Sequence, residues 1–212
     1  MNFKNYFSTL KDWNRFPAYH LEDRIEPLIG YFLPDIIQSA LGVKVKGVIP
    51  EFPLRLGTIR PEFGGKPISE RSYKVSFYAL GEDGTHYLIE LRTILSPSFG
   101  QQDDFLQKAK ERGMEKIIDG LTRIAKLTSH KATNKYEHLK DKLKELGILN
   151  KIETFIHPMK EIQIIAIQPK LPRKDRGEKV ITFQTVVKIL KENYPEDEFV
   201  VEFASALESW GE

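Results

Sequence analysis

Apolar residues recur at helical spacing near the start of the chain and then change to the alternation typical of a strand. Over residues 21–41 they repeat every three or four positions, which predicts a helix, but two prolines inside this stretch each remove a backbone donor. We therefore expect one broken helix or two short ones, ending at Gly42. Residues 43–50 alternate valines with lysines and predict a strand, and the proline- and glycine-rich residues 53–67 predict a loop.

The clearest local pattern is a β-hairpin. Two runs rich in β-branched and aromatic residues, 73–80 and 85–93, are separated by a turn that contains two glycines. Pairing Gly81 with Thr85 gives three facing pairs, which are Tyr78 with Leu88, Ser76 with Glu90, and Lys74 with Arg92. One side of the hairpin is then wholly apolar, and the other side gathers the charged and polar residues.

The second half of the chain alternates helical and strand patterns. Helices are predicted at residues 101–127, 134–146 and 183–193, and strands at residues 161–168 and 198–207. The run 161–168 is almost continuously apolar, as expected for a strand buried on both faces. The order of elements predicts an α/β protein with a mixed sheet and helices on its faces, and a length of 212 residues favours a single domain.

Composition excludes several classes of protein. The chain has no cysteine, which excludes disulfide frameworks, thiolate zinc sites and cysteine nucleophiles, and fits a cytoplasmic location. With 32 basic and 30 acidic residues the net charge is +2, so any basic surface must be local. Charges and a proline interrupt the most apolar stretch, residues 27–48, and we expect neither a membrane span nor a signal peptide. The five histidines show no pair at metal-ligand spacing.

The candidate chemistry lies in Glu90 and Arg92, two residues apart on a predicted strand and therefore on the same side of the sheet. A carboxylate can hold a divalent metal that polarises a phosphate, and a neighbouring cation can orient water or stabilise developing charge. The pair therefore indicates phosphoryl transfer. The alternative is an ordinary exposed face, on which both residues form cross-strand salt bridges with Lys74 and its neighbours.

Several segments of the chain together carry a resemblance to a known family. They are the helix with Glu22 and Glu26, the segment Pro50-Glu51-Phe52-Pro53-Leu54, the hairpin, the triplet Glu90-Leu91-Arg92, and Ser96-Pro97-Ser98-Phe99 followed by Gln102. In this combination the chain resembles the PD-(D/E)XK nuclease superfamily, and within it bacterial proteins of restriction-endonuclease-like fold with a degenerate motif. The resemblance covers residues 20–168 and leaves residues 169–212 as a C-terminal extension of one helix and one strand.

The resemblance implies an αβββαβ core and cleavage of nucleic acid phosphodiesters with Mg²⁺ or Mn²⁺. It assigns metal binding to the carboxylate of Glu90 and the carbonyl of Leu91. It also gives an assisting role to a glutamine on the following helix, for which Gln102 is preferred to Gln101, and to a glutamate on the preceding helix.

Two of the three defining positions depart from the family pattern, because its aspartate falls at Ser76 and its lysine at Arg92. A serine hydroxyl is a weak, neutral ligand for Mg²⁺, and arginine cannot act as a base. Glu22 or Glu26, four residues apart on one helix face, is a candidate for a migrated metal-binding carboxylate. We therefore expect weak or absent cleavage.

Two hypotheses stay open. In the first, a nuclease with a variant site, Glu90 and a carboxylate of the preceding helix hold the metal while Arg92 stabilises the phosphate. In the second, an inactive descendant serves as a non-catalytic module that binds DNA or RNA or assembles with other proteins. A homodimer is compatible with both. The basic side of residues 101–127 is either a solvated face or a surface that follows phosphates.

Overall fold

The computed structural model describes residues 2–93, 100–127, 130–158, 160–172 and 178–211, without the side chains of residues 130–133. Its five-stranded sheet has the order β1 (Val45–Arg55), β2 (Ser72–Gly81), β3 (His86–Leu91), β4 (Ile162–Gln168) and β5 (Lys179–Thr182). Strand β2 pairs antiparallel with β1 and with β3, whereas β4 and β5 are parallel, so the predicted α/β class with a mixed sheet is confirmed. Among the described residues, no helix is long and apolar enough to cross a membrane.

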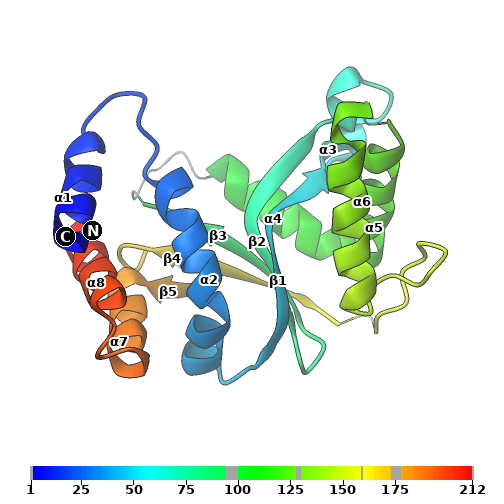
Figure 1. Ribbon diagram of the computed structural model, residues 1–212. Helices are drawn as coiled ribbons and strands as arrows, with labels where there is room; N and C mark the ends of the chain where they lie inside the picture. The colour runs from blue at the N-terminus through cyan, green and yellow to red at the C-terminus, as the bar shows by residue number, and fades with distance from the viewer. Residues whose placement is uncertain (1, 94–99, 128–129, 159, 173–177, 212) are drawn as a thin grey trace. The chain divides into compact units, whose positions relative to one another are not determined.

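Contacts divide the chain into two compact units, and Figure 1 shows their elements. The terminal unit comprises Met1–Lys44, Glu90–Ser96 and Ile165–Glu212, and the middle unit comprises Val45–Ile89 and Pro97–Ile164. The terminal unit contains α1 (Phe3–Trp13), α2 (Glu22–Leu41), β5 (Lys179–Thr182), α7 (Phe183–Asn193) and α8 (Glu198–Trp210). The middle unit contains β1 (Val45–Arg55), α3 (Leu56–Ile59), η1 (Pro61–Phe63), η2 (Pro67–Glu70), β2 (Ser72–Gly81), α4 (Gly100–Arg112), α5 (Met114–Leu127) and α6 (His130–Glu145). Strands β3 (His86–Leu91) and β4 (Ile162–Gln168) have residues in both units.

In the terminal unit, the prediction of a closing strand at residues 198–207 is wrong. These residues form helix α8, whose first turn is capped by the Asp197 side chain accepting a hydrogen bond from the backbone N–H of Val200, 3.0 Å away. Phe199 and Phe203, one helical turn apart, both contact the ring of Phe7. Figure 1 shows α1 in blue alongside α8 in red. The C-terminal extension therefore contains a short strand and two helices.

Helix α2 is continuous, so the expected break at its prolines is wrong. Pro27 and Pro34 are seven residues apart, which is about two turns, and they therefore lie on the same side of the helix. That side is turned away from the buried residues, such as Ile25 and Ile29, so the two missing donors leave the buried side intact. The helix ends at Gly42 as predicted, in a left-handed conformation with φ 73°.

In the middle unit, the predicted hairpin and its register are confirmed over the paired residues. Tyr78 pairs with Leu88, and the N–H of Gly81 donates to the carbonyl of Thr85 at 2.9 Å. Gly84 takes φ 83°, the left-handed conformation that a three-residue turn requires at its last position. Strand β1 is longer than predicted, and the rest of the predicted loop folds into α3, η1 and η2.

The long helix predicted at residues 101–127 is in fact two helices, α4 and α5. Gly113 separates them with φ 79°, a conformation that ends a helix and that glycine adopts without strain. The other predicted elements of the second half, α6, β4 and α7, are confirmed. Thr182 caps α7 as predicted, with its hydroxyl oxygen accepting from the N–H of Thr185 at 3.2 Å.

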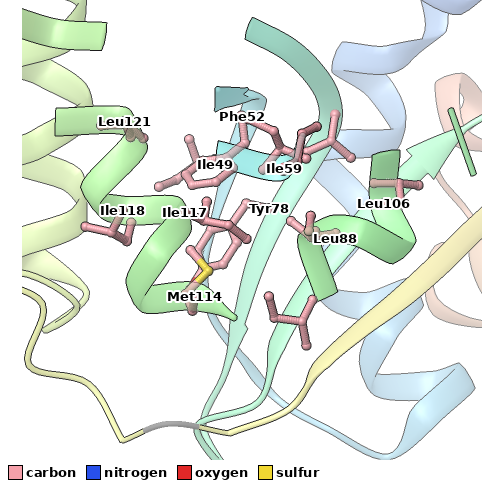
Figure 2. Packing of buried hydrophobic residues seen from close by; sticks show 14 of the residues in the cluster. Ile49, Phe52, Ile59, Tyr78, Leu88, Leu106, Met114, Ile117, Ile118 and Leu121 are labelled. Atoms are coloured by element: carbon pink, nitrogen blue, oxygen red, sulfur yellow. The ribbon is translucent and has the colours of Figure 1, made fainter. Parts of the chain in front are cut away.

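Figure 2 shows the apolar core of the middle unit, in which α5 covers one face of β1 and β2. Ile49 and Phe52 of β1 both belong to this core, although residues three apart on a regular strand point to opposite faces. Between them Glu51 has φ 46°, a left-handed conformation that is unusual for a residue with a side chain. The side of β1 that faces the core therefore switches at Glu51.

Candidate functional site

The triplet Glu90-Leu91-Arg92 lies in the terminal unit, at the end of β3 and just beyond it. The N–H of Arg92 donates to the carbonyl of Ile167 in β4 at 2.9 Å, which holds the triplet beside that strand. Glu90 is only 6% exposed and Arg92 only 1%. The alternative of an ordinary exposed face is therefore wrong, because both charged side chains are buried.

The Arg92 guanidinium is held by a carboxylate that follows it by 86 residues. Its Nη1 donates to Oε1 of Glu178 at 2.8 Å and its Nη2 donates to Oε2 at 3.3 Å. Nη1 also donates to the side-chain oxygen of Gln168, at 3.2 Å. The side chain of Glu178 is only 3% exposed, so the pair lies out of solvent. The contact is bidentate, because two nitrogens of the guanidinium donate to the two oxygens of one carboxylate.

The acidic start of α2 lies against the residue that follows the triplet. Oε1 of Glu22 accepts hydrogen bonds from the backbone N–H of Thr93 at 2.9 Å and from its hydroxyl at 3.1 Å. Glu26, one turn further along α2, is half-buried. The structure therefore places the Glu22 carboxylate beside the residue that follows the triplet.

Metal binding would require several of these carboxylates to converge on one point. In the described part of the chain, no group of three or more histidine, cysteine, aspartate or glutamate residues is arranged to hold a metal ion. The carboxylates that the resemblance places in this site are Glu22, Glu26 and Glu90, and Oε1 of Glu22 accepts two hydrogen bonds from Thr93. Oxygen donors are the ligands that Mg²⁺ prefers.

The other two predicted site residues belong to the middle unit. Ser76 is half-buried on β2. Two residues before it, Lys74 forms an ion pair with Glu51 of β1, with 2.5 Å between Nζ and Oε2. Gln102 lies in the first turn of α4, and its buried Oε1 has no hydrogen-bond partner among the described residues.

The basic side of α4 and α5 is largely neutralised by acidic residues of the same unit. The ion pairs are Lys108 with Glu62 and Asp104, Lys110 with Glu161, Lys116 with Asp119, and Arg123 with Glu70. This distribution is typical of a solvated face, and it favours that interpretation over a surface that follows phosphates.

Sequence reasoning did not find Glu178, Gln168 and Thr93, which contact the predicted residues. Gln168 ends an apolar run, and a polar residue at the end of a buried strand is a weak signal that it binds something. Glu178 stands in a charged connection with five acidic or basic neighbours within five residues, so nothing in the local pattern marks it as the partner of Arg92.

The chain was also compared with known proteins. Searches of protein-family models, of curated proteins and of solved structures gave no match. What the protein does is therefore inferred from the contacts of its own residues.

Proposed function

We propose that this chain is a non-catalytic nucleic-acid-binding module on a restriction-endonuclease-like fold, in which the cation of a degenerate nuclease triplet has become structural. The observation that carries the proposal is the buried, bidentate ion pair of Arg92 with Glu178. An arginine held in this way can reach a phosphate or a water molecule only by leaving its partner carboxylate. Breaking a buried pair costs about 3–5 kcal/mol, because one charge is left uncompensated.

The order of elements supports the fold in this proposal. Helix α2, strands β1, β2 and β3, the pair of helices α4 and α5, and strand β4 follow one another in the αβββαβ order of the nuclease core. The sheet order β1-β2-β3-β4 is also the order in which these strands occur in the chain.

The nucleic-acid part of the proposal is supported by the resemblance and by the charge of α6. This helix carries five lysines against three acidic residues, so two positive charges remain in excess after the pairs of Lys140 with Glu137, Lys142 with Glu145 and Lys144 with Asp141. Phosphate contacts from lysine supply most sequence-independent affinity for nucleic acid.

The contact of Glu22 with Thr93 favours a second candidate, a nuclease with a variant site. In this candidate Glu90, the carbonyl of Leu91 and a carboxylate of α2 would hold Mg²⁺ or Mn²⁺, and the metal would polarise the phosphate. It requires Glu22 to exchange its hydrogen bonds to Thr93 for the metal, or Glu26 to serve instead.

A cleavage and binding assay separates the two candidates. The purified protein is incubated with single- and double-stranded DNA and RNA, with Mg²⁺ and with Mn²⁺, beside an authentic nuclease. Glu90→Gln tests the triplet, and Glu82→Gln, an exposed residue of the hairpin turn, is the matched control. We expect binding without cleavage in all three proteins. Cleavage that Glu90→Gln abolishes and Glu82→Gln preserves would overturn the proposal in favour of the nuclease, and failure to bind any of the four nucleic acids would overturn it outright.

A further inference from the structure

The middle unit contains a groove of about 480 Å³ between α6 and the first two strands. Its apolar walls are formed by Val48, Pro50 and Pro53 of β1 and by Tyr136 and Leu139 of α6. This volume lies within the range of pockets that take small organic groups, roughly 300–1,000 Å³. Prolines and a tyrosine offer flat surfaces, against which a planar aromatic group packs well.

The groove is rimmed by cations. Lys74, Lys135 and Lys142 line it, against a single acidic residue among the lining residues, Glu51. Two of these lysines form exposed ion pairs. Lys74 pairs with Glu51 at 2.5 Å, with the two side chains 59% and 63% exposed, and Lys142 pairs with Glu145 at 2.6 Å. Exposed pairs of this kind contribute little to stability, so a phosphate can replace the carboxylate.

We propose that this groove binds single-stranded nucleic acid, with bases against the proline and tyrosine walls and phosphates at the lysines. Two of the cations are spaced along α6, where Lys135 and Lys142 are seven residues apart, about 10 Å along the helix axis. Such spacing fits a ligand whose negative charge recurs at intervals, and fits a single phosphate group less well. A duplex keeps its bases stacked inside and has none to offer to the apolar walls.

The inference takes the class of ligand from the proposed function but uses none of the triplet residues. The negative charge of Glu51 opposes the binding of a phosphate in this groove. Its left-handed backbone is costly for a residue with a side chain, and such strain collects at functional sites. Its carboxylate lies against Lys74 and competes with a phosphate for that lysine. Glu51→Gln therefore frees the lysine and tightens binding.

The test is fluorescence anisotropy with a labelled ten-residue thymidine oligomer, over a series of salt concentrations. Lys135→Gln/Lys142→Gln removes two groove cations, and Lys11→Gln/Lys188→Gln removes two exposed cations elsewhere. Each phosphate contact on a single strand contributes about −0.7 to the slope of log affinity against log salt. We expect the groove variant to reduce the magnitude of the slope by about 1.4 and to weaken binding on the order of tenfold at low salt, with the control variant unchanged.

An abasic oligomer of the same length has the same charges without the bases, and it tests the apolar walls. Base stacking on an aromatic side chain predicts a loss of about tenfold for Tyr136→Ala with the thymidine oligomer, and little change with the abasic one. Equal affinity of the wild type for the two oligomers would overturn base binding and leave a surface for polyanions. Competition by thymidine monophosphate as strong as that by the oligomer would assign the groove to free nucleotides and overturn the proposal for a strand.

The outcomes for the groove and for the proposed function are distinguishable. Binding that the groove variant does not weaken overturns the groove alone. Metal-dependent cleavage lost in Glu90→Gln overturns the non-catalytic function alone, and a wild-type protein that binds no nucleic acid overturns both. The lysines and Glu51 are exposed, so their substitution should leave the melting temperature unchanged, and circular dichroism checks that each variant is folded.

Discussion

The hydroxyl oxygen of Tyr78 lies 2.8 Å from Nδ1 of His86, and neither side chain is exposed to solvent. The ring of His157 stands 4.8 Å from that of His86, at a steep angle to it. Burial, reinforced by repulsion from His157 and opposed by the carbonyl of Pro158, lowers the pKa of His86 to about 4. Burial also raises the pKa of Tyr78. Both side chains are therefore neutral at pH 7.

This pair predicts a loss of stability in weak acid. The pKa of His86 is about 4 in the folded protein, below its ordinary value of 6.5, so between these values the unfolded chain binds more protons. The contribution of uncharged His86 to the free energy of unfolding is fully present above pH 6.5. It is lost as the pH falls towards 4, and the loss is about 3 kcal/mol in all. Urea unfolding at a series of pH values measures it. His86→Gln should flatten this part of the profile, and the exposed His20→Gln should not. Equal profiles for the three proteins would contradict the assignment.

The buried ion pair predicts strong coupling between Arg92 and Glu178. Arg92→Met or Glu178→Leu alone leaves one buried charge without its partner and should lower the free energy of unfolding by about 3–5 kcal/mol. The double variant should lose much less than the sum of the two, because no charge is left uncompensated. Denaturant unfolding of the four proteins gives the coupling energy. The exposed pair Lys188 and Glu192 is the control, and its coupling should be below about 1 kcal/mol. Additive losses at Arg92 and Glu178 would show that the pair does not act as a unit.

The close approach of α5 to α3 predicts that Gly120 tolerates no side chain. A Cβ atom on Gly120 would lie 2.2 Å from Oγ1 of Thr58, which is far inside contact distance. Gly120→Ala should therefore destabilise the protein by roughly 1–3 kcal/mol, the usual cost of overpacking. Thr58→Ala removes the clashing hydroxyl and should recover part of the loss in the double variant. Thermal unfolding measures both effects, and a double variant no more stable than Gly120→Ala would locate the strain elsewhere.

The cap of α8 predicts a smaller effect. Asp197→Ala removes the side chain that accepts from the N–H of Val200 and should cost about 1 kcal/mol. In a chain of this length that corresponds to a fall in melting temperature of about 2–4 °C. The neighbouring exposed Glu196→Ala should change the melting temperature by less than about 1 °C. A similar fall in both variants would point to loss of charge and not to the cap.

Elements whose signals are local could be predicted from the sequence. The hairpin register follows from Gly84, whose left-handed conformation favours a three-residue turn between the paired strands. The end of α2 at Gly42 and the start of α7 at Thr182 likewise depend on a few adjacent residues.

Other elements could not be predicted, because two structures satisfy the same pattern. Residues 198–207 are rich in β-branched and aromatic residues and fit a strand, yet Phe199 and Phe203 also have the spacing of one helical turn, and packing against Phe7 favours the helix. The partner of the triplet arginine could not be predicted for a different reason. A buried arginine is recognisable only with its carboxylate, and Glu178 lies 86 residues away from Arg92 in the sequence.

The Arg92 and Glu178 pair also bears on how reversible a loss of catalysis is. On the proposed function, a return to a working triplet requires lysine at position 92. Lysine keeps the charge but has no planar fork to engage both carboxylate oxygens. Changing Glu178 first leaves a guanidinium buried without its counterion, at a cost that takes a large share of a total stability of about 5–15 kcal/mol. On the proposed function, the ion pair therefore makes a return to a working triplet costly, because either first step would lower the stability of the fold before the second could restore catalysis.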